Sequence, residues 1–401
     1  MAAERRLLTR VALRNYKSIA ACDVEPAQLC FLVGPNGSGK SNFLDALRFV
    51  ADSLRFSIDH ALRDRGGINE VRRRSGGHPT HFGIRLDLDL RESRGYFAFT
   101  VGAKKQGGYE IQAEEGLVLP HNGEGSHHYR VERGRVVRST LPTALAAAAD
   151  RLYLVNLSGT PSFRPVYDAL SGAGFYSLNP QQIRELQPPN PGELLNRDGS
   201  NIASVLANLT TRSPDSKQRI EQYLSKVVPG IEGVRRKVLG SRETLEFRQG
   251  VRGAQHPWRF LAGSMSDGTL RAFGVLMAVF QGVANGRTAP GLVGIEEPEL
   301  ALHPAATGVL IDSLRDAAEH LQILVTSHST ELLDDEEIPS DSILAVRAEY
   351  GESRIGPVDE TARTALRDHL FTAGELLRMD QLDPDPELSK PGQIRLFGPE
   401  R

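Results

Sequence analysis

The sequence is poor in the residues that mark disulfide-stapled and metal-stapled proteins. Its 401 residues include only two cysteines, Cys22 and Cys30, and no spacing of Cys and His resembles a zinc site. The histidines His127, His128 and His303 also lack partners at metal-ligand spacing, so we expect them to be surface or structural residues. A reduced, cytoplasmic compartment is the simplest expectation.

Long apolar runs and a strong excess of either charge are also absent. No stretch reaches ~18 consecutive apolar residues, and the charged segment 1–14 lacks the apolar centre of a signal peptide, so we expect no membrane partner. The formal net charge is -2, and any contact with nucleic acid must therefore come from a local patch. No heptad repeat is sustained, which argues against a long coiled-coil arm.

One basic stretch stands out against this balanced charge. It consists of Arg63, Arg65, Arg72, Arg73 and Arg74 among glycines. Such a stretch either tracks a nucleic-acid backbone or forms a solvated loop, and solvated loops are the more common case. We keep nucleic-acid binding by these arginines as a secondary hypothesis.

Buried strands alternate with helices at both ends of the chain. Apolar runs predict strands at residues 7–13 and 29–33, and one apolar helical face predicts a helix from 41 to about 54. A later series consists of strands at 291–295, 321–326 and 343–346, with helices from Pro304 and from about Leu270 to Val283. This alternation predicts an α/β fold whose mixed core sheet is assembled from both ends of the sequence.

The middle of the chain follows other patterns. Apolar and polar residues alternate over about 75–140, which indicates an antiparallel β lobe with hairpins. Proline and asparagine punctuation and the helical patterns at 202–209 and 220–228 indicate a helical insertion within about 160–230. We therefore divide the chain into 1–160, 161–235 as the insertion, 236–350, and a C-terminal extension at 351–401.

A glycine-rich segment between the second strand and the first helix carries the strongest motif. Residues 34–41, Gly-Pro-Asn-Gly-Ser-Gly-Lys-Ser, fit the phosphate-binding pattern G-x-x-x-x-G-K-[ST]. In such a loop backbone N–H groups and a helix N-terminus face phosphate oxygens, so Lys40 would reach the β and γ phosphates and Ser41 would offer its hydroxyl to Mg²⁺. The predicted ATP-binding residues are Asn36, Gly37, Ser38, Gly39, Lys40, Ser41 and Asn42. A glycine-rich turn with an incidental lysine is the alternative.

Two adjacent carboxylates follow the predicted strand at 291–295. Glu296 and Glu297 would lie at the carboxyl edge of a buried strand, where ligands bind in open α/β sheets. Glu296 would then hold the Mg²⁺ shell, and Glu297 would orient and deprotonate the attacking water. The alternative is an acidic helix start that faces solvent.

Two weaker signals complete the predicted site. Residues 264–269, Ser-Met-Ser-Asp-Gly-Thr, precede a helix, so Ser266 and the backbone at Gly268 would form a second phosphate-facing helix N-terminus. His328 follows the strand at 321–326, a position suited to hydrogen bonding with a γ phosphate. Taken singly, Ser266 could equally be an ordinary N-cap and His328 an ordinary loop histidine.

With these motifs in place, the chain resembles ABC-type ATPases of the SMC, RecF and OLD superfamily, and in particular RecF-like stand-alone AAA-family ATPases of bacteria. The landmarks are residues 15–18 (Asn-Tyr-Lys-Ser), the loop at 34–41, the signature at 265–269, the Walker B segment at 295–299, Leu-His-Pro at 302–304, and His328. The signature departs from the transporter LSGGQ at Asp267 and Thr269, and Gln112 is the only candidate offered for a phosphate-sensing Gln loop. The resemblance implies a head that binds ATP and Mg²⁺ and whose signature meets the glycine loop of a second copy in a homodimer or higher homo-oligomer.

Two functions compete. One is an ATPase coupled to a DNA transaction in repair or anti-phage defence, which the arginine stretch favours. The other is a slow-turnover ATP-dependent scaffold that licenses a separate effector, such as a TOPRIM-type nuclease or a toxin. Only some seventy residues follow His328, fewer than the ~100 of a typical compact domain, so we expect any nuclease to be another chain. A transporter subunit ranks last, because it needs a membrane partner and an LSGGQ signature.

Overall fold

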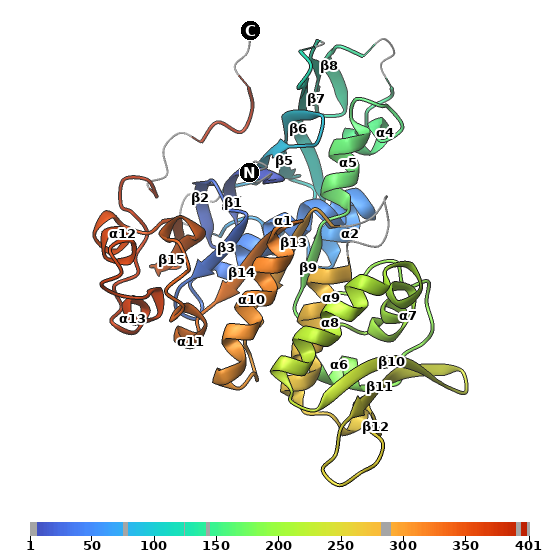
Figure 1. Ribbon diagram of the computed structural model, residues 1–401. Helices are drawn as coiled ribbons and strands as arrows, with labels where there is room; N and C mark the ends of the chain where they lie inside the picture. The colour runs from blue at the N-terminus through green and yellow to red at the C-terminus, as the bar shows by residue number, and fades with distance from the viewer. Residues whose placement is uncertain are drawn as a thin grey trace. The chain divides into compact units, whose positions relative to one another are not determined.

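The computed structural model describes residues 6–74, 79–123, 125–141, 145–281, 290–389 and 394–398. The chain divides into two compact units, each built from segments that are distant in the sequence (Figure 1). The first unit comprises residues 1–173, 338–371 and 376–401, and the second comprises 174–337 and 372–375. Both ends of the chain therefore contribute to the first unit.

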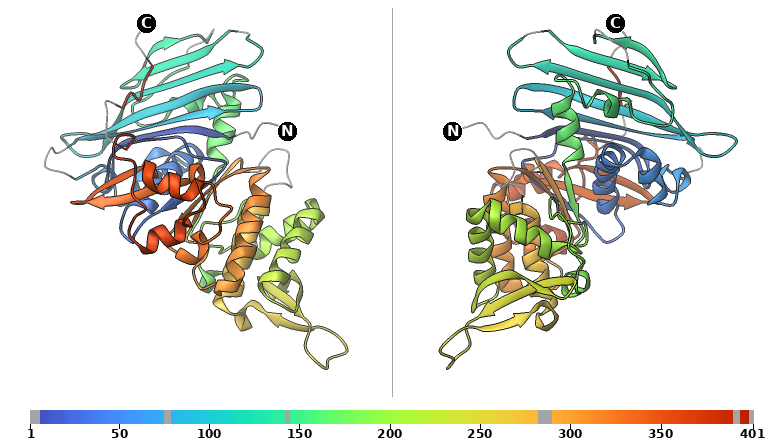
Figure 2. Two further views of the ribbon diagram at one scale, coloured as in Figure 1. Left: turned by 60° about the vertical axis from the view of Figure 1, so that its left-hand side comes forward. Right: turned by 90° about the vertical axis from the view of Figure 1, so that its right-hand side faces the viewer.

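A seven-stranded antiparallel sheet dominates the first unit, with the strand order β2-β1-β4-β5-β6-β7-β8 (Figure 2). Its strands are β1 Leu8–Tyr16, β2 Ile19–Val24, β4 His81–Asp89, β5 Ser93–Ala103, β6 Tyr109–Pro120, β7 His127–Glu132 and β8 Arg135–Ser139. The apolar residues that alternate along β4, including Phe82, Ile84 and Leu86, are all buried, because a strand turns every second side chain toward the same face. The predicted antiparallel lobe is confirmed.

A shorter set of strands and the main helix complete the first unit. Strand β3 Leu29–Val33 pairs in parallel with β15 Ile343–Glu349, which pairs antiparallel with β16 Glu352–Pro357. Helix α1 Lys40–Arg55 buries Phe49, whose ring meets Tyr16 of β1 and Phe82 of β4 edge-on. The remaining helices are α2 Ile58–Arg63, α3 Ile68–Val71, α4 Tyr153–Leu157, α5 Arg164–Ser171, the 3-10 helix η4 Ser340–Ser342 and α12 Glu360–Arg367.

The second unit holds a parallel set of strands flanked by helices. Strand β13 Leu292–Glu296 pairs in parallel with β14 Gln322–Ser327 on one side and with β9 Gly174–Tyr176 on the other. Parallel neighbours need a long crossover, which α10 Thr307–Ala318 supplies between β13 and β14. The other helices are α6 Pro180–Arg184, α7 Ile202–Arg212, α8 Pro214–Val227, η1 Ala262–Ser264, α9 Asp267–Phe280, η3 Pro304–Ala306 and α11 Thr330–Leu333, while α13 Ala373–Arg378 crosses the boundary between the units.

A three-stranded antiparallel sheet in the second unit was not predicted. It consists of β10 Ile231–Leu239, β11 Arg242–Gln249 and β12 Trp258–Leu261. The signal was present, because Leu245 and Phe247 alternate with charged residues, but the strands are rich in Arg and Glu and carry no long apolar run. The proposed four-part division of the chain remains a prediction.

One predicted helix boundary was wrong by about one turn, and another was confirmed as the start of a 3-10 helix. Helix α9 begins at Asp267 rather than near Leu270, because Ser266 caps it. Its predicted end at Val283 lies outside the described residues. The helix predicted from Pro304 begins there as the 3-10 helix η3 and continues as the α-helix α10 from Thr307. None of the helices in the described ranges combines the length and the apolar character that crossing a bilayer demands.

Candidate functional site

The glycine loop joins β3 to α1 in the first unit, and close neighbours require glycine in it. Gly39 precedes α1 with a φ of 108°, in the left-handed region that other residues rarely adopt. A Cβ atom at Gly39 would lie 2.0 Å from Oγ of Ser353, and one at Gly34 would lie 2.0 Å from the carbonyl oxygen of Val346. Strands β15 and β16 therefore press against the loop so closely that no side chain fits at either glycine.

The loop presents a set of donors at the start of α1. Nζ of Lys40 donates to the carbonyl oxygens of Gly34 at 2.7 Å and Pro35 at 2.9 Å, and the residue is only 5% exposed. Oγ of Ser38 is buried and has no hydrogen-bond partner in the part of the chain that the structure describes. Ser41, in the first turn of α1, is exposed. A buried ammonium, an orphaned hydroxyl and a helix N-terminus without a side-chain cap fit phosphate groups, and an exposed hydroxyl oxygen fits Mg²⁺.

The predicted loop residue Asn42 is turned to a structural contact instead. Its Nδ2 donates to Oγ of Ser18 at 2.7 Å, and that oxygen lies 2.7 Å from Oγ of Ser353. The N–H of Ser353 also donates to the carbonyl oxygen of Ser18 at 2.9 Å. This chain of hydrogen bonds ties the first turn of α1 to the β1–β2 turn and to β16. Asn36 and Gly37 are exposed at the tip of the loop.

A buried ion-pair network also anchors α1. Asp45 accepts from the hydroxyl of Tyr16 at 2.9 Å and pairs with Lys17 at 2.6 Å and Arg65 at 3.0 Å. Burial alone would raise the pKa of Asp45, but Arg65 and Lys17 outweigh it and lower that pKa to about 2. Tyr16 and Lys17 belong to the motif at 15–18, so the structure gives that motif a physical role: it fixes the helix that carries the glycine loop.

Some arginines of the stretch make structural contacts, whereas the side chains of Arg63 and Arg74 are 78% and 68% exposed, so nucleic-acid binding by this stretch stays a hypothesis. Arg65 has a side chain that is only 2% exposed, and it bridges Asp45 and Asp52 of α1. Arg73 pairs with Glu352 at 2.8 Å. The other three are also engaged: Arg63 with Asp59, Arg74 with Glu70, and Arg72 with Asn69 and the carbonyl oxygen of Pro79. Five arginines that look alike in the sequence therefore have different roles, and among them Arg65 joins α2 to α1.

In the second unit, two residues that were predicted separately lie in contact. Glu297 follows β13 with a φ of 45°, and its N–H donates to the carbonyl oxygen of Thr326 at 3.0 Å. Its Oε1 lies 3.0 Å from Nδ1 of His328, which follows the end of β14. The parallel pairing of β13 with β14 brings these two side chains to one edge of the strands. A carboxylate and an imidazole in this contact can share or pass a proton.

Two arginines outside the predicted set hold the same edge. Arg271 of α9 donates through Nη2 to the carbonyl oxygens of Glu296 at 3.3 Å and Glu297 at 2.9 Å. Arg197, 99 residues before Glu296 in the sequence, donates through Nη2 to Oε1 of Glu296 at 2.8 Å. The carboxylate predicted to bind Mg²⁺ is thus paired with a guanidinium. No local pattern could have revealed either arginine, because each meets its partner only through the fold.

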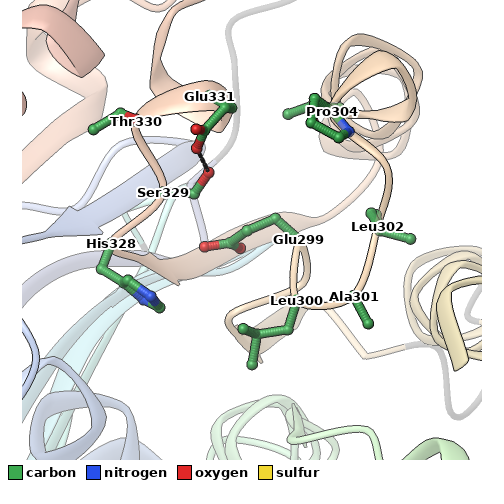
Figure 3. Close-up of a pocket in the computed structure, with 10 residues that line it drawn as sticks. Glu299, Leu300, Ala301, Leu302, Pro304, His328, Ser329, Thr330 and Glu331 are labelled. Carbon is green, nitrogen blue, oxygen red and sulfur yellow. Dashed lines mark hydrogen bonds between the residues drawn. The ribbon is translucent and has the colours of Figure 1, made fainter.

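A pocket of about 300 Å³ lies beside this edge, within the second unit (Figure 3). Residues 299–302, 304, 307 and 328–331 line it. Oε1 of Glu299 accepts a hydrogen bond from Oγ of Ser327 at 2.6 Å, while Oε2 is buried without a partner among the described residues. Burial raises the pKa of Glu299, and the hydrogen bond from Ser327 opposes that effect. Sequence reasoning did not assign Glu299 a role, although it stands two positions after Glu297.

The signature segment forms the start of α9. Oγ of Ser266 accepts from the N–H of Thr269 at 3.2 Å, so Ser266 is an N-cap, and the residue is exposed. Gly268 has no room for a side chain, since a Cβ atom would lie 2.5 Å from the carbonyl oxygen of Ala301. An exposed helix N-terminus can face an anion, and the cap does not exclude this role.

Other sequence candidates have structural roles. Gln112 lies inside strand β6, where its amide packs against Gly102, so it does not stand in a loop. Nε2 of His128 lies 3.0 Å from Oε1 of Glu115, and Nδ1 of His303 accepts from the N–H of Ala305. Over the ranges that the structure describes, no three His, Cys, Asp or Glu side chains gather as a metal would require.

Comparison with known proteins places this geometry in a family. The family model described as "AAA domain, putative AbiEii toxin, Type IV TA system" matches residues 29–334, which is more than half of the chain. Among curated proteins, structural maintenance of chromosomes protein 4 of Schizosaccharomyces pombe is 28% identical over 193 residues, or 41% of this chain. The corresponding protein of Dictyostelium discoideum is 50% identical over 50 residues, or 12% of this chain. The chain spans only 14% and 4% of the lengths of these two relatives.

Solved structures agree on the fold. An Smc head domain with an extended coiled coil, bound to the C-terminal domain of ScpA from Pyrococcus furiosus, gives a TM-score of 0.56 at 10% identity, covering 91% of this chain and 99% of that chain. An Smc head bound to the C-winged helix domain of ScpA gives a TM-score of 0.55 at 14% identity, covering 87% and 97%. With a glycine loop on one unit and a paired carboxylate edge on the other, the chain belongs to this AAA-domain family and has the fold of the Smc head domains.

Proposed function

We propose that this chain binds ATP and Mg²⁺ at its glycine loop and hydrolyses ATP in a site that a second copy completes. The contact between Oε1 of Glu297 and Nδ1 of His328 at 3.0 Å carries the proposal. A carboxylate that ends a strand and touches an imidazole is suited to accept a proton from water. The same chain carries a loop with the donors that phosphate groups need, which supports the proposal.

Each predicted residue then has a task. Lys40 would exchange its two carbonyl acceptors for phosphate oxygens, which offer a charge-assisted bond of greater strength. Ser41 and Glu296 would hold Mg²⁺, which when bound neutralises charge that develops on the phosphate. Glu297 would take the proton of the attacking water, and His328 would orient Glu297 and hydrogen-bond the γ phosphate. Arg271 keeps the backbone of both glutamates in place.

The signature would act across a homodimer or higher homo-oligomer. Ser266, which caps the first turn of α9, is exposed in one copy, so its hydroxyl is available to a phosphate held by another copy. This arrangement makes ATP itself part of the interface. Hydrolysis would then depend on protein concentration.

The DNA-linked role in repair or anti-phage defence is our first candidate for the process. The curated relatives act in the structural maintenance of chromosomes by name, and the family description names a toxin of a toxin–antitoxin system. Both favour a nucleic-acid or defence setting, and we keep the cytoplasm as the proposed location. The partner that we propose for this role is an effector protein such as a TOPRIM-type nuclease.

A scaffold with slow turnover is the second candidate, and one contact favours it. Arg197 holds Oε1 of Glu296 at 2.8 Å, so the proposed Mg²⁺ ligand must exchange a guanidinium before it can serve. Such an exchange would slow the formation of the Mg²⁺ site and so lengthen the time between ATP binding and hydrolysis. An ATP-bound dimer that persists in this way could hold an effector, as Smc heads are seen bound to ScpA.

The proposal is tested by measuring the rate at which the Lys40→Ala and Lys105→Ala proteins release phosphate from ATP. Lys40→Ala should reduce hydrolysis to background, because the ammonium that pairs with phosphate oxygens is gone. Lys105, an exposed lysine in the turn between β5 and β6, is the matched control and should keep the wild-type rate. A Lys40→Ala protein with the wild-type rate would falsify the assignment of the loop.

A further inference from the structure

The three-stranded sheet of the second unit collects positive side chains on one of its faces. Register pairs Arg235 with Glu246, and Lys237 with Thr244, while on the other side of β11 it pairs Arg248 with Arg259. Because side chains alternate along a strand, Arg235, Lys237, Glu246 and Arg259 all project from the same face. We call this the basic face.

One buried carboxylate stands at the centre of the basic face. Glu246 has a side chain that is only 6% exposed, and Nε of Arg235 donates to its Oε1 at 2.6 Å. Lys237 and Arg259 approach the same carboxylate only to 3.8 Å and 4.0 Å, beyond hydrogen-bond distance. Their side chains are 42% and 60% exposed. Three cations therefore share one anion, and the face keeps an excess of positive charge in a chain whose net charge is -2.

The opposite face of the sheet is used for packing. Phe247 meets Phe273 of α9 edge-on, and Glu243 accepts a hydrogen bond from Ser204 of α7. Trp258 and Phe260 share the parity of Phe247 and project to that side. Within β10, β11 and β12, all of which the structure describes, the basic face carries no aromatic ring. It therefore lacks the stacking surface that binding of single-stranded nucleic acid uses.

We propose that the basic face binds the phosphate backbone of double-stranded DNA. The proposal deepens the DNA-linked function suggested above and gives it a location other than the arginine stretch. Lys237 and Arg259 belong to the two outer strands, so their charges are separated across the width of the sheet and can contact different phosphates. Such contacts carry no sequence information, and they release counterions from the duplex.

The test measures the affinity of the full chain for a labelled DNA duplex over a series of salt concentrations, without nucleotide. The variant Lys237→Gln/Arg259→Gln removes two charges and leaves the Arg235–Glu246 bond intact. The matched control, Lys104→Gln/Lys105→Gln, removes two exposed charges from the first unit. For the variant, the slope of log affinity against log salt should fall by about 1.8, since each lost contact contributes about 0.9. The control should keep the wild-type slope.

Other outcomes decide against the proposal. If the variant keeps the wild-type slope, and its far-UV spectrum and thermal midpoint match those of the wild type, the basic face does not bind DNA. Equal loss of binding to polyglutamate and to the duplex would assign the face to an acidic protein partner, and tighter binding to a single strand or to an RNA duplex would also overturn the assignment. Because the assay contains no nucleotide, a failed ATPase assignment at Lys40 leaves its result standing. Hydrolysis without DNA should be unchanged in the Lys237/Arg259 variant.

Discussion

Oγ of Ser327 donates a hydrogen bond of 2.6 Å to Oε1 of Glu299, which joins the turn after β13 to the end of β14. Oγ of Ser327 also accepts a hydrogen bond from the N–H of Ser329 at 3.0 Å, so both neighbours of His328 are held. Glu297 contacts the imidazole of His328, and Glu299 accepts a hydrogen bond from Ser327, the residue before it. The bond between Ser327 and Glu299 fixes the approach of His328 to Glu297.

Ser327→Ala should lower kcat with little change in the KM for ATP, because the histidine loses its alignment while nucleotide binding at the glycine loop is untouched. A misalignment that costs about 1.4 kcal/mol would slow turnover roughly tenfold. Glu299→Gln retains an acceptor oxygen and should be milder, and Glu299→Ala should add little to Ser327→Ala, since both remove the same bond. Ser313→Ala, which removes another fully buried serine hydroxyl, is the control. Equal losses in the Ser313 and Ser327 variants would mean that the effect is one of stability alone.

Glu297→Gln should bind ATP but fail to turn it over, because the amide cannot take the proton of water. The nucleotide would then stay at the interface, and light scattering with ATP should report a persistent dimer. Glu319→Gln, an exposed glutamate after α10, should behave like the wild type. A Glu297→Gln protein that remains monomeric with bound ATP would contradict the model of a site shared by two copies.

Mixing two inactive variants should show where the signature acts. Ser266→Arg places bulk and charge at the start of α9, and Lys40→Ala removes the ammonium of the glycine loop. If the signature acts on the ATP of the other copy, a mixed dimer contains one intact site and activity should return in part. Heterodimers that a tag pull-down demonstrates but that lack activity would count against action in trans. The exception is hydrolysis that needs both sites at once. In that case, mixing Ser266→Arg protein into wild-type protein should lower the wild-type activity.

Stability should depend on pH through Glu114 of β6. This fully buried carboxyl accepts from the N–H groups of Tyr153 at 2.6 Å and Leu154 at 2.8 Å, and from the hydroxyl of Tyr129. Burial raises the pKa of Glu114 from 4.5 to about 7, against the opposing effect of these hydrogen bonds. The folded state therefore binds more protons than the unfolded state between these two pH values. Its contribution to the free energy of unfolding is largest below 4.5, falls as pH rises to about 7, and is level above that.

Urea unfolding across that pH range gives the measurement. As pH rises, the free energy of unfolding of the wild type should fall by up to about 3 kcal/mol through this group. Glu114→Gln should lose that part of the pH dependence. It should also be less stable at every pH, since the two N–H groups bond to different side-chain atoms and only one atom of an amide is an acceptor. Glu92→Gln, at an exposed position next to β5, should leave the profile unchanged. A Glu114→Gln profile that is parallel to the wild-type profile would exclude this carboxyl as the source.

The sequence by itself determined the parts of this protein that consecutive residues can build. The glycine loop at 34–41 was predicted in its strand-to-helix setting, because the phosphate-binding geometry is made by neighbouring backbone groups. The strands at β13 and β14 and the helix α1 were likewise predicted from apolar runs and periodicity, since burial imposes those patterns locally.

Only the tertiary structure decided which charges are paired and which remain available. Arg65 and Lys237 are both basic residues in polar stretches, yet one is buried between two aspartates and the other stands exposed on the basic face. Glu297 met His328, and Glu296 met Arg197, only once parallel strands and a distant turn brought them to one edge. The strength of a charge contact depends on distance and burial, and the fold sets both between residues that the sequence keeps far apart.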